Sequence, residues 1–249
     1  MANIILNTPG SGTWEAPVGV VGVTASIFGG GGGGGGNVQT TADGGGGAGG
    51  SAFSYSRIAV TSGSLYNYVV GIAGSGSIAL PGLNASASWF MHPRTQSAAG
   101  GGGGFPSVGT VPGVGGLRGH STASDTIGDI KWSGGRGGNA RNSSTGRGGS
   151  AGSSAGTGSD GLNGFDLGTA GVPVETTASD AGGWVGGRGA AVTSGPGSEP
   201  STGSGGGGGG CSEGTSVRGG NGRDGRIKLE WTSTIVSTAK TMFVLWMGD

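Results

Sequence analysis

Runs of consecutive glycine constrain the fold of this chain more than any other feature of its sequence. The longest run covers residues 29–36, and shorter runs cover residues 44–47, 100–104 and 205–210. Glycine makes up 68 of the 249 residues, which is far above the usual share of about 7%. Glycine has no side chain to bury, and it loses more backbone entropy on ordering than any other residue. A large core of packed aliphatic side chains is therefore excluded.

Two familiar glycine-rich structures do not fit this sequence. Collagen requires glycine at every third position and abundant proline, but the spacing here is irregular and the chain has 9 prolines. A flexible Gly/Ser linker has no regular apolar content, but apolar and aromatic residues recur among these glycines. The backbone must then supply the order, because shielded N–H and C=O groups need partners. Polyproline-II segments have no internal hydrogen bonds, so they can bond to one another where glycine lets them approach.

Four segments have the alternating pattern of β-strands. They cover residues 18–28, 53–60, 65–70 and 226–231, where apolar side chains occupy every second position. Residues 61–64 have the composition of a hairpin connection between the second and third of these strands. We expect Trp14 to lie in the small β core, whereas residues 89–91 suit either the edge of that core or an exposed patch.

The predicted fold class is all-β or irregular: a small β-sandwich frames a lattice of glycine-rich polyproline-II-type helices, with essentially no α-helix. The alternative places the glycines in loops that hang from the sandwich. Three parts are predicted along the chain. Residues 1–99 form a β-rich part with the first glycine runs, residues 100–231 form the lattice with variable loops and a closing strand, and residues 232–249 form an apolar tail for attachment or assembly.

Charge and reactive residues argue against several functions. The 13 basic and 13 acidic residues balance, so we expect no nucleic-acid partner. His92 and His120 have no acid or cysteine beside them, and the acidic residues are scattered singly. The single Cys211 permits neither an internal disulfide nor a cysteine-based zinc site. We therefore expect no enzyme activity, cofactor or metal, and the first residues lack the pattern of a secretory signal.

Both ends of the chain carry a resemblance to a known family. Residues 8–20 read TPGSGTWEAPVGV, followed by an alternating strand and the long glycine run, and residues 219–231 read GGNGRDGRIKLEW. This pair resembles the opening and closing of the glycine-rich domain found in bacteriophage tail-fibre and other virion proteins, where a Gly-Asp-Gly-like turn precedes the last strand. The middle is similar in style to the polyglycine-helix sandwich adhesins of T-even-like long tail fibres. The helical attachment segment of those adhesins is absent here.

The segments between the glycine runs contain the candidate binding residues. Single aromatic or basic side chains stand there among small residues, where loops on a rigid scaffold are suited to recognition. The candidates for receptor binding are Phe105, Arg118, His120, Trp132, Arg136, Phe165, Trp184 and Arg188. For Trp132, Phe165 and Trp184 the alternative is that they cap the edges of the lattice.

The C-terminal tail differs from the rest because it has almost no glycine. Its apolar residues are candidates for assembly by strand addition, or they fold back onto the β part; they are Met242, Phe243, Val244, Leu245 and Trp246. The resemblance implies a virion protein, made in the host cytoplasm, that recognises a bacterial surface receptor. That receptor is an outer-membrane protein or a polysaccharide, and other virion proteins and a second copy of the chain are further partners. A non-adhesive structural virion protein is the alternative.

Overall fold

The protein is described here from a computed structural model. The structure describes residues 1–37, 44–78, 80–108, 111–119, 122, 125–140, 148–149, 151–155, 158–164, 197 and 217–232. Within these residues it has nine strands, all paired antiparallel in two sheets, and no helix. The prediction of an all-β fold without α-helix is confirmed.

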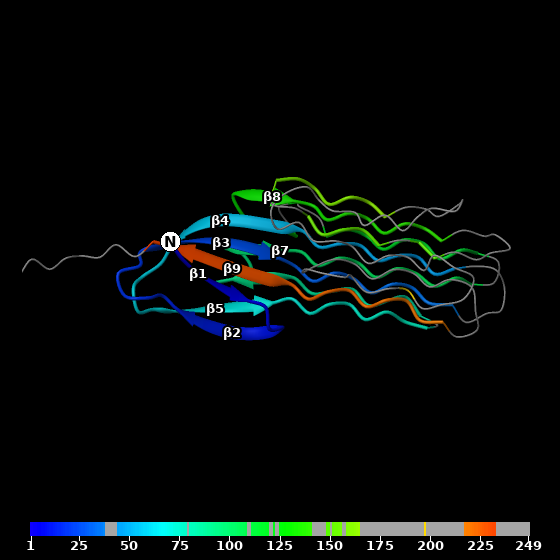
Figure 1. The fold of residues 1–249 in the computed structure, drawn as a ribbon, viewed down its shortest axis with the longest axis horizontal. Coiled ribbons are helices and arrows are strands. Elements are labelled where there is room, and N and C mark those ends of the chain that lie inside the picture. Colours follow the sequence, from blue (N-terminus) through cyan, green and yellow to red (C-terminus); the bar gives the residue numbers. More distant parts are fainter. Residues whose placement is uncertain are drawn as a thin grey trace, which may run out of the picture.

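The strands occupy one end of the molecule (Figure 1). A five-stranded sheet has the order β1 (Ala2–Leu6), β9 (Arg226–Trp231), β3 (Gly22–Phe28), β4 (Phe53–Ala59), β8 (Ile130–Trp132). A four-stranded sheet has the order β2 (Gly10–Glu15), β5 (Leu65–Val70), β6 (Ser88–Phe90), β7 (Gln96–Ala98). The first and last strands of the chain meet in the five-stranded sheet, because β9 lies between β1 and β3.

Side chains from both sheets form one apolar core. Val23, Ala25 and Ile27 of β3 are buried, and the intervening residues of that strand face away from the core. Trp14 of β2 reaches across to the other sheet, where its ring lies 5.6 Å from that of Trp231. The predicted alternation and the core position of Trp14 are therefore confirmed. Phe90 is fully buried and Met91 packs against the core, so these two residues belong to the core, whereas Trp89 is half-buried and lies outside that cluster.

Two local predictions are wrong. Residues 61–64 do not connect a hairpin, because β4 and β5 lie in different sheets. This turn instead bonds to the connection between β2 and β3, where Ala16 N donates to Ser64 O at 3.0 Å and Gly63 N donates to Ala16 O at 2.8 Å. The two crossings between sheets therefore lie side by side.

The strand predicted over residues 18–28 begins only at Gly22. A turn precedes it, in which Val20 N donates to Pro17 O at 3.0 Å and Gly19 has a φ of 81°. That positive φ is a conformation that glycine adopts readily. The turn holds the first residues of the predicted strand away from the sheet.

An array of extended glycine-rich segments continues the sandwich at one end (Figure 1). β3, β5, β7 and β8 lead directly into array segments, and β4, β6 and β9 follow directly from them. The segments cover residues 29–37, 44–52, 71–77, 82–86, 100–105, 113–119, 133–140, 151–155, 160–164 and 217–225. Segments from both sides of the predicted boundary between residues 99 and 100 bond to each other. The division into three parts itself stays a prediction.

Hydrogen bonds in the array repeat every three residues. The N–H groups of segment 29–37 donate in turn to segments 44–52, 82–86 and 217–225. The bonds to the first neighbour join Gly29 N to Ala52 O at 3.3 Å, Gly32 N to Gly49 O at 3.1 Å and Gly35 N to Gly46 O at 2.9 Å. Three residues per turn is the period of polyproline II, and the assignment of that geometry stays a prediction. The bonds themselves satisfy the buried backbone that glycine leaves without side-chain cover.

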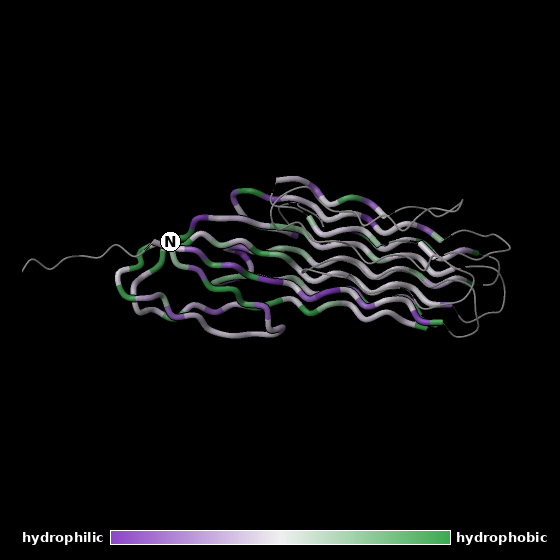
Figure 2. Tube along the Cα trace, viewed as in Figure 1, coloured by the Kyte–Doolittle hydropathy of each residue, from purple (hydrophilic) through white to green (hydrophobic). Residues whose placement is uncertain are grey.

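Close backbone approach explains why the array needs glycine. A Cβ atom built at Gly49 would overlap the carbonyl of Leu117, and one at Gly82 would overlap the carbonyl of Gly33. Figure 2 shows that most of the array is close to neutral in hydropathy, so burial of large side chains does not hold it together. Among the described residues, the glycines of these segments are therefore bonded to neighbouring segments through the backbone.

Candidate functional site

Asparagine and aspartate side chains close the exposed edges of the array. Several outer N–H groups that have no backbone partner donate to a side-chain oxygen of the adjacent segment. The bonds join Gly76 N to Asn221 Oδ1 at 3.0 Å, Ala73 N to Asp224 Oδ1 at 2.8 Å, Gly103 N to Asn84 Oδ1 at 2.8 Å, Gly115 N to Asn139 Oδ1 at 2.9 Å, Ser133 N to Asp160 Oδ1 at 2.6 Å and Arg136 N to Asn163 Oδ1 at 2.9 Å. We call these side chains the edge caps.

Sequence reasoning missed the edge caps, although they have a signal. Asn221 and Asp224 are three residues apart, and each precedes a glycine; Asp160 and Asn163 repeat the same pattern. This spacing matches the three-residue repeat of the array. Asp224 was predicted to belong to a turn before the closing strand, but it lies in array segment 217–225 and caps Ala73. The pattern of an Asn or Asp before glycine at every third residue therefore marks an array edge.

Removal of one edge cap is expected to destabilise the fold measurably. Asn84→Ala would leave the Gly103 N–H without its acceptor, and we expect a loss of about 1 kcal/mol in the free energy of unfolding. Asn84→Asp keeps an acceptor oxygen at the same position and should cost less. Urea unfolding of both variants and the wild type measures the difference. Equal stability of Asn84→Ala and the wild type would contradict the capping role.

Exposed apolar side chains gather at the end of the array farthest from the sandwich. Segments 71–77 and 100–105 run away from the strands, turn, and return as segments 82–86 and 113–119. The turns and the adjoining ends of these segments carry exposed apolar residues, here called the tip residues: Ile78, Leu80, Leu83, Phe105, Val108, Val111 and Val114. Gly82 N donates to Gly104 O at 2.8 Å, so the two turns are neighbours. Figure 2 shows apolar positions where array segments end at this side.

In the second turn, Val108 and Val111 form an antiparallel bridge, and this pair is here called the hairpin. Val108 and Val111 exchange two backbone hydrogen bonds of 3.1 and 3.0 Å, and their exposed fractions are 68% and 62%. Phe105 N donates to Val114 O at 2.8 Å, which fixes the base of the hairpin on the array. Phe105, a predicted receptor-binding residue, is 49% exposed at this base. Its apolar ring is thus presented to solvent by a bonded backbone.

Two other predicted residues, Arg118 and Arg136, come together on the side of the array. Their segments are antiparallel neighbours, with Gly134 N to Gly119 O at 2.9 Å and Gly137 N to Gly116 O at 3.0 Å. Both arginines are exposed and line one hollow of about 200 Å³ together with Leu117 and Asn163. The spacing of 18 residues in the sequence gives no sign of this pairing, because it depends on the register that the backbone hydrogen bonds set between the two segments.

Trp132 has a different environment from the other predicted residues. It is partly buried on β8 and packs against a second apolar cluster formed by Phe28, Phe53 and Ala155. The rings of Phe28 and Phe53 lie 4.9 Å apart, and Arg226 lies over Phe28, with its Cζ 5.8 Å from the ring centroid. Burial lowers the pKa of the Arg226 guanidinium from its ordinary value.

The remaining predicted residues lie outside the described residues. They are His120, Phe165, Trp184 and Arg188 of the receptor-binding set, and Met242, Phe243, Val244, Leu245 and Trp246 of the assembly set. The predictions for them stay open. Among the described residues, no group of three His, Cys, Asp or Glu side chains could hold a metal ion. No helix in the described ranges is long and apolar enough to cross a membrane.

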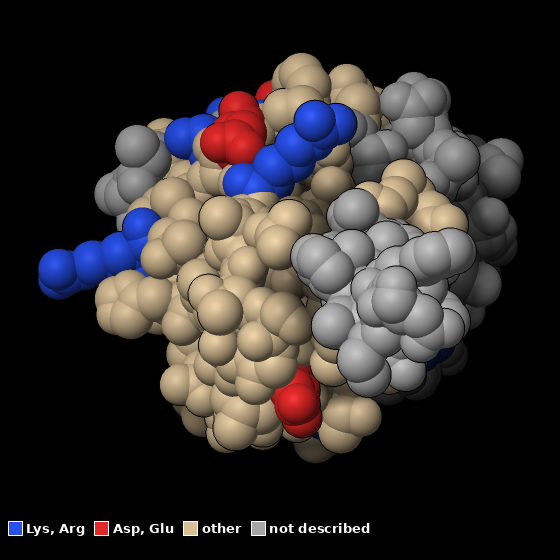
Figure 3. Space-filling view, turned by 90° about the vertical axis from the view of Figure 1, so that its left-hand side faces the viewer, with Lys and Arg blue, Asp and Glu red and all other residues tan. Residues whose placement is uncertain are grey.

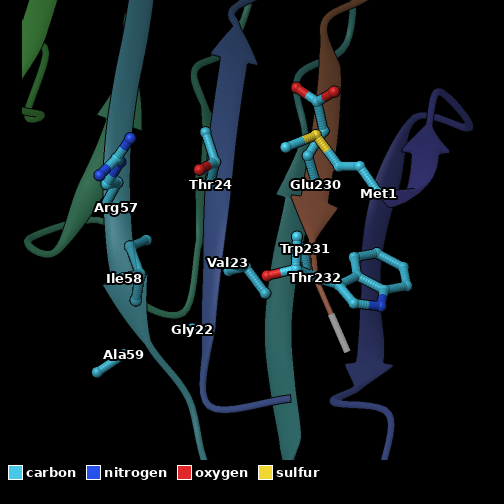
Figure 4. A pocket seen from close by; sticks show the side chains of 10 residues that line it. All are labelled: Met1, Gly22, Val23, Thr24, Arg57, Ile58, Ala59, Glu230, Trp231 and Thr232. Atoms are coloured by element: carbon cyan, nitrogen blue, oxygen red, sulfur yellow. The ribbon is translucent and has the colours of Figure 1, made fainter. Parts of the chain in front are cut away.

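A broad hollow of about 440 Å³ lies on the five-stranded sheet (Figure 4). It is lined by β3, β4 and the end of β9, and Arg57 and Glu230 flank Thr24 in one row across these strands. Glu230 accepts a salt bridge from Lys228 Nζ at 2.8 Å. Figure 3 shows the sandwich end of the molecule, where basic and acidic side chains lie close together and most of the visible described face is uncharged. Among the described residues, the lining has no second carboxylate and no histidine.

Fold and geometry together define the class of protein. It is an all-β protein in which a small sandwich is continued by a backbone-bonded glycine array with exposed residues on its tip and side. The chain belongs to the glycine-rich domain family, whose model matches residues 7–232. A search of curated proteins found no match.

Proposed function

We propose that the protein is a bacteriophage tail-fibre or receptor-binding virion protein that recognises the bacterial cell surface through the tip of its glycine array. The exposed tip residues are the observation that carries this proposal. Seven exposed apolar side chains lie on two neighbouring turns and the adjoining segment ends, at the end of the array opposite the sandwich. Contiguous exposed apolar surface is typical of interaction sites in soluble proteins.

The array gives these side chains a rigid support. Backbone hydrogen bonds at the second turn fix the positions of Phe105, Val108 and Val111. A preformed loop loses little conformational entropy when it binds, so more of the contact energy appears as affinity. Binding residues on loops above a rigid scaffold are a common arrangement in recognition proteins. The resemblance of both chain ends to phage glycine-rich domains supports the same proposal.

Under this proposal the tip contacts the bacterial receptor, and the sandwich end is free to contact other virion proteins. An apolar tip favours an outer-membrane protein over a neutral polysaccharide as the receptor that it contacts, because apolar side chains contribute most where they fill complementary apolar surface. The protein would act by binding alone, in the mature virion.

Replacement of the hairpin valines is expected to weaken binding to host cells without unfolding the protein. Val108→Ser/Val111→Ser removes apolar side chains from the tip, and we expect binding to fall about tenfold or more if they form part of a hot spot. Val18→Ser/Val21→Ser is the matched control, because these valines are 89% and 70% exposed and lie near the sandwich. Fluorescently labelled protein, titrated on a panel of bacteria, measures the binding.

The panel includes cells stripped of surface protein and cells stripped of polysaccharide. Loss of binding after protein stripping would identify an outer-membrane protein as the receptor, as expected. Equal binding by the tip and control variants would contradict a role for the tip. If the wild type bound no cell at all, including the host of its source, the non-adhesive structural virion protein would be favoured instead.

A further inference from the structure

At one position on the side of the array, a basic side chain stands where the register would place an edge cap. Asn139 caps Gly115, and the same antiparallel register places residue 136 opposite residue 118 at the next repeat. That position is occupied by an arginine. A guanidinium group has donors and no acceptor, so it cannot cap an N–H group. The Arg118 N–H accordingly has no acceptor within the described part of the chain.

The missing cap coincides with a hollow lined by donors. Arg118, Arg136 and Asn163 surround about 200 Å³, and Arg136 and Asn163 also line an adjoining hollow of about 160 Å³. Asn163 Oδ1 accepts the Arg136 N–H at 2.9 Å, which leaves the amide Nδ2 of Asn163 as a donor. Among the described residues, no carboxylate lines either hollow. The only bond of these guanidinium groups to a described side chain is a long one of 3.4 Å, from Arg136 to Asn139 Oδ1.

We propose that this hollow binds an oxyanion, a phosphate or a carboxylate, whose oxygen takes the place of the missing edge cap. The oxygen would accept the Arg118 N–H, as the Asn139 side chain accepts the Gly115 N–H one repeat away. The two guanidinium groups supply the counter-charge and the planar donor pairs that suit phosphate and carboxylate groups. Leu117, which is 67% exposed, provides an apolar wall beside the anion.

The anion site is a separate surface from the tip, and it stands whether or not the tip binds cells. Its biological source rests on the proposed function: an adhesin with this site would bind the phosphate or acidic sugar of a bacterial surface polysaccharide. The tip would then contact an apolar protein surface, and the anion site would contact an acidic glycan. Because the arginines are exposed, binding should weaken as salt is added.

The test uses NMR spectra of the full-length, isotope-labelled protein titrated with methyl phosphate or with glucuronate. We expect the Arg118 backbone amide resonance to move and to saturate with at least one probe, and the responsive probe identifies the preferred anion. Neutral glucose at the same concentrations should leave that resonance in place. Failure of both anions to move it, or shifts that grow without saturation across the whole spectrum, would overturn the proposal.

Two variants make the test specific. Arg136→Asn restores an edge cap at the position opposite Arg118, so the anion response should weaken tenfold or more while the melting temperature stays equal or rises. Arg94→Ala removes an exposed arginine near the sandwich and should leave the response unchanged. An undiminished response in Arg136→Asn would overturn the proposal. A saturating anion response in a protein that binds no cells would contradict the proposed function but leave the anion site intact.

Discussion

Gly33→Ala should cost about 3 kcal/mol or more in the free energy of unfolding, which is a large effect for the addition of one methyl group. A Cβ at this position would overlap the carbonyl of Ser75 and would lie 2.6 Å from Gly76 N. The neighbouring backbone cannot easily move away, because Ser75 O accepts a bond from Leu83 N at 2.9 Å. To admit the methyl group, the array would have to separate and break bonds that no side chain could replace. Urea unfolding measures this loss.

Gly22→Ala is the matched control for that variant. Gly22 lies at the start of β3, and a Cβ there would meet only Ile58 O, at an ordinary contact distance of 3.6 Å. We expect this change to be neutral or to stabilise the protein by about 0.4–1 kcal/mol, because alanine restricts the unfolded chain. If Gly33→Ala were tolerated as well as Gly22→Ala, the segments would not be packed as closely as the structure has them. That result would favour loops over an array.

Phe90→Ala should destabilise the sandwich by about 3–5 kcal/mol, the usual cost of removing a buried aromatic ring. Phe90 is fully buried, and its ring lies 5.8 Å from Trp14 and 6.2 Å from Tyr66. These rings come from β6, β2 and β5 of the four-stranded sheet, and Trp14 also contacts Trp231 of the other sheet. The cavity would therefore open at the contact that joins the two sheets. Thermal and urea unfolding would detect the loss.

Phe105→Ala removes the same side chain from the tip and serves as the control. Phe105 is 49% exposed, so its removal should change the free energy of unfolding by about 0.5 kcal/mol or less. The two variants are expected to separate stability from recognition: Phe90→Ala loses stability, whereas Phe105→Ala keeps stability and binds cells less tightly. A large loss of stability in Phe105→Ala would instead indicate that the ring supports the array.

The strands were predictable because their signal is local. Ile227, Leu229 and Trp231 alternate with polar residues, and a strand buries every second side chain. The partners of a strand are not local. Residues 53–60 and 65–70 are separated by a short turn, which favours a hairpin, yet the two strands pair in different sheets. Pairing of β3 with β4 along seven residues, and of β2 with β5 along six, decides the topology instead.

The candidate site was predictable only in part, for a similar reason. Composition marked Phe105, Arg118 and Arg136 as unusual side chains among glycines, and all three are exposed. It did not predict that the two arginines lie together. It also did not distinguish the exposed candidates from Trp132, which is partly buried and packs against Phe28 and Phe53. Exposure depends on which segments lie above a residue. The glycine segments are nearly identical in sequence, so the sequence has no local signal for the order in which they pack side by side.

The sequence by itself determined that backbone hydrogen bonds, and not side-chain burial, would have to order the glycine runs. Glycine has no side chain to bury, and its N–H and C=O groups need partners. It also determined the alternation of the main strands. The tertiary structure decided which segments are neighbours, which outer N–H groups meet an edge cap, and that Arg136 stands opposite Arg118 where the register would place a cap. These properties depend on the register between segments distant in the chain, and every glycine offers the same donor and acceptor to any neighbour.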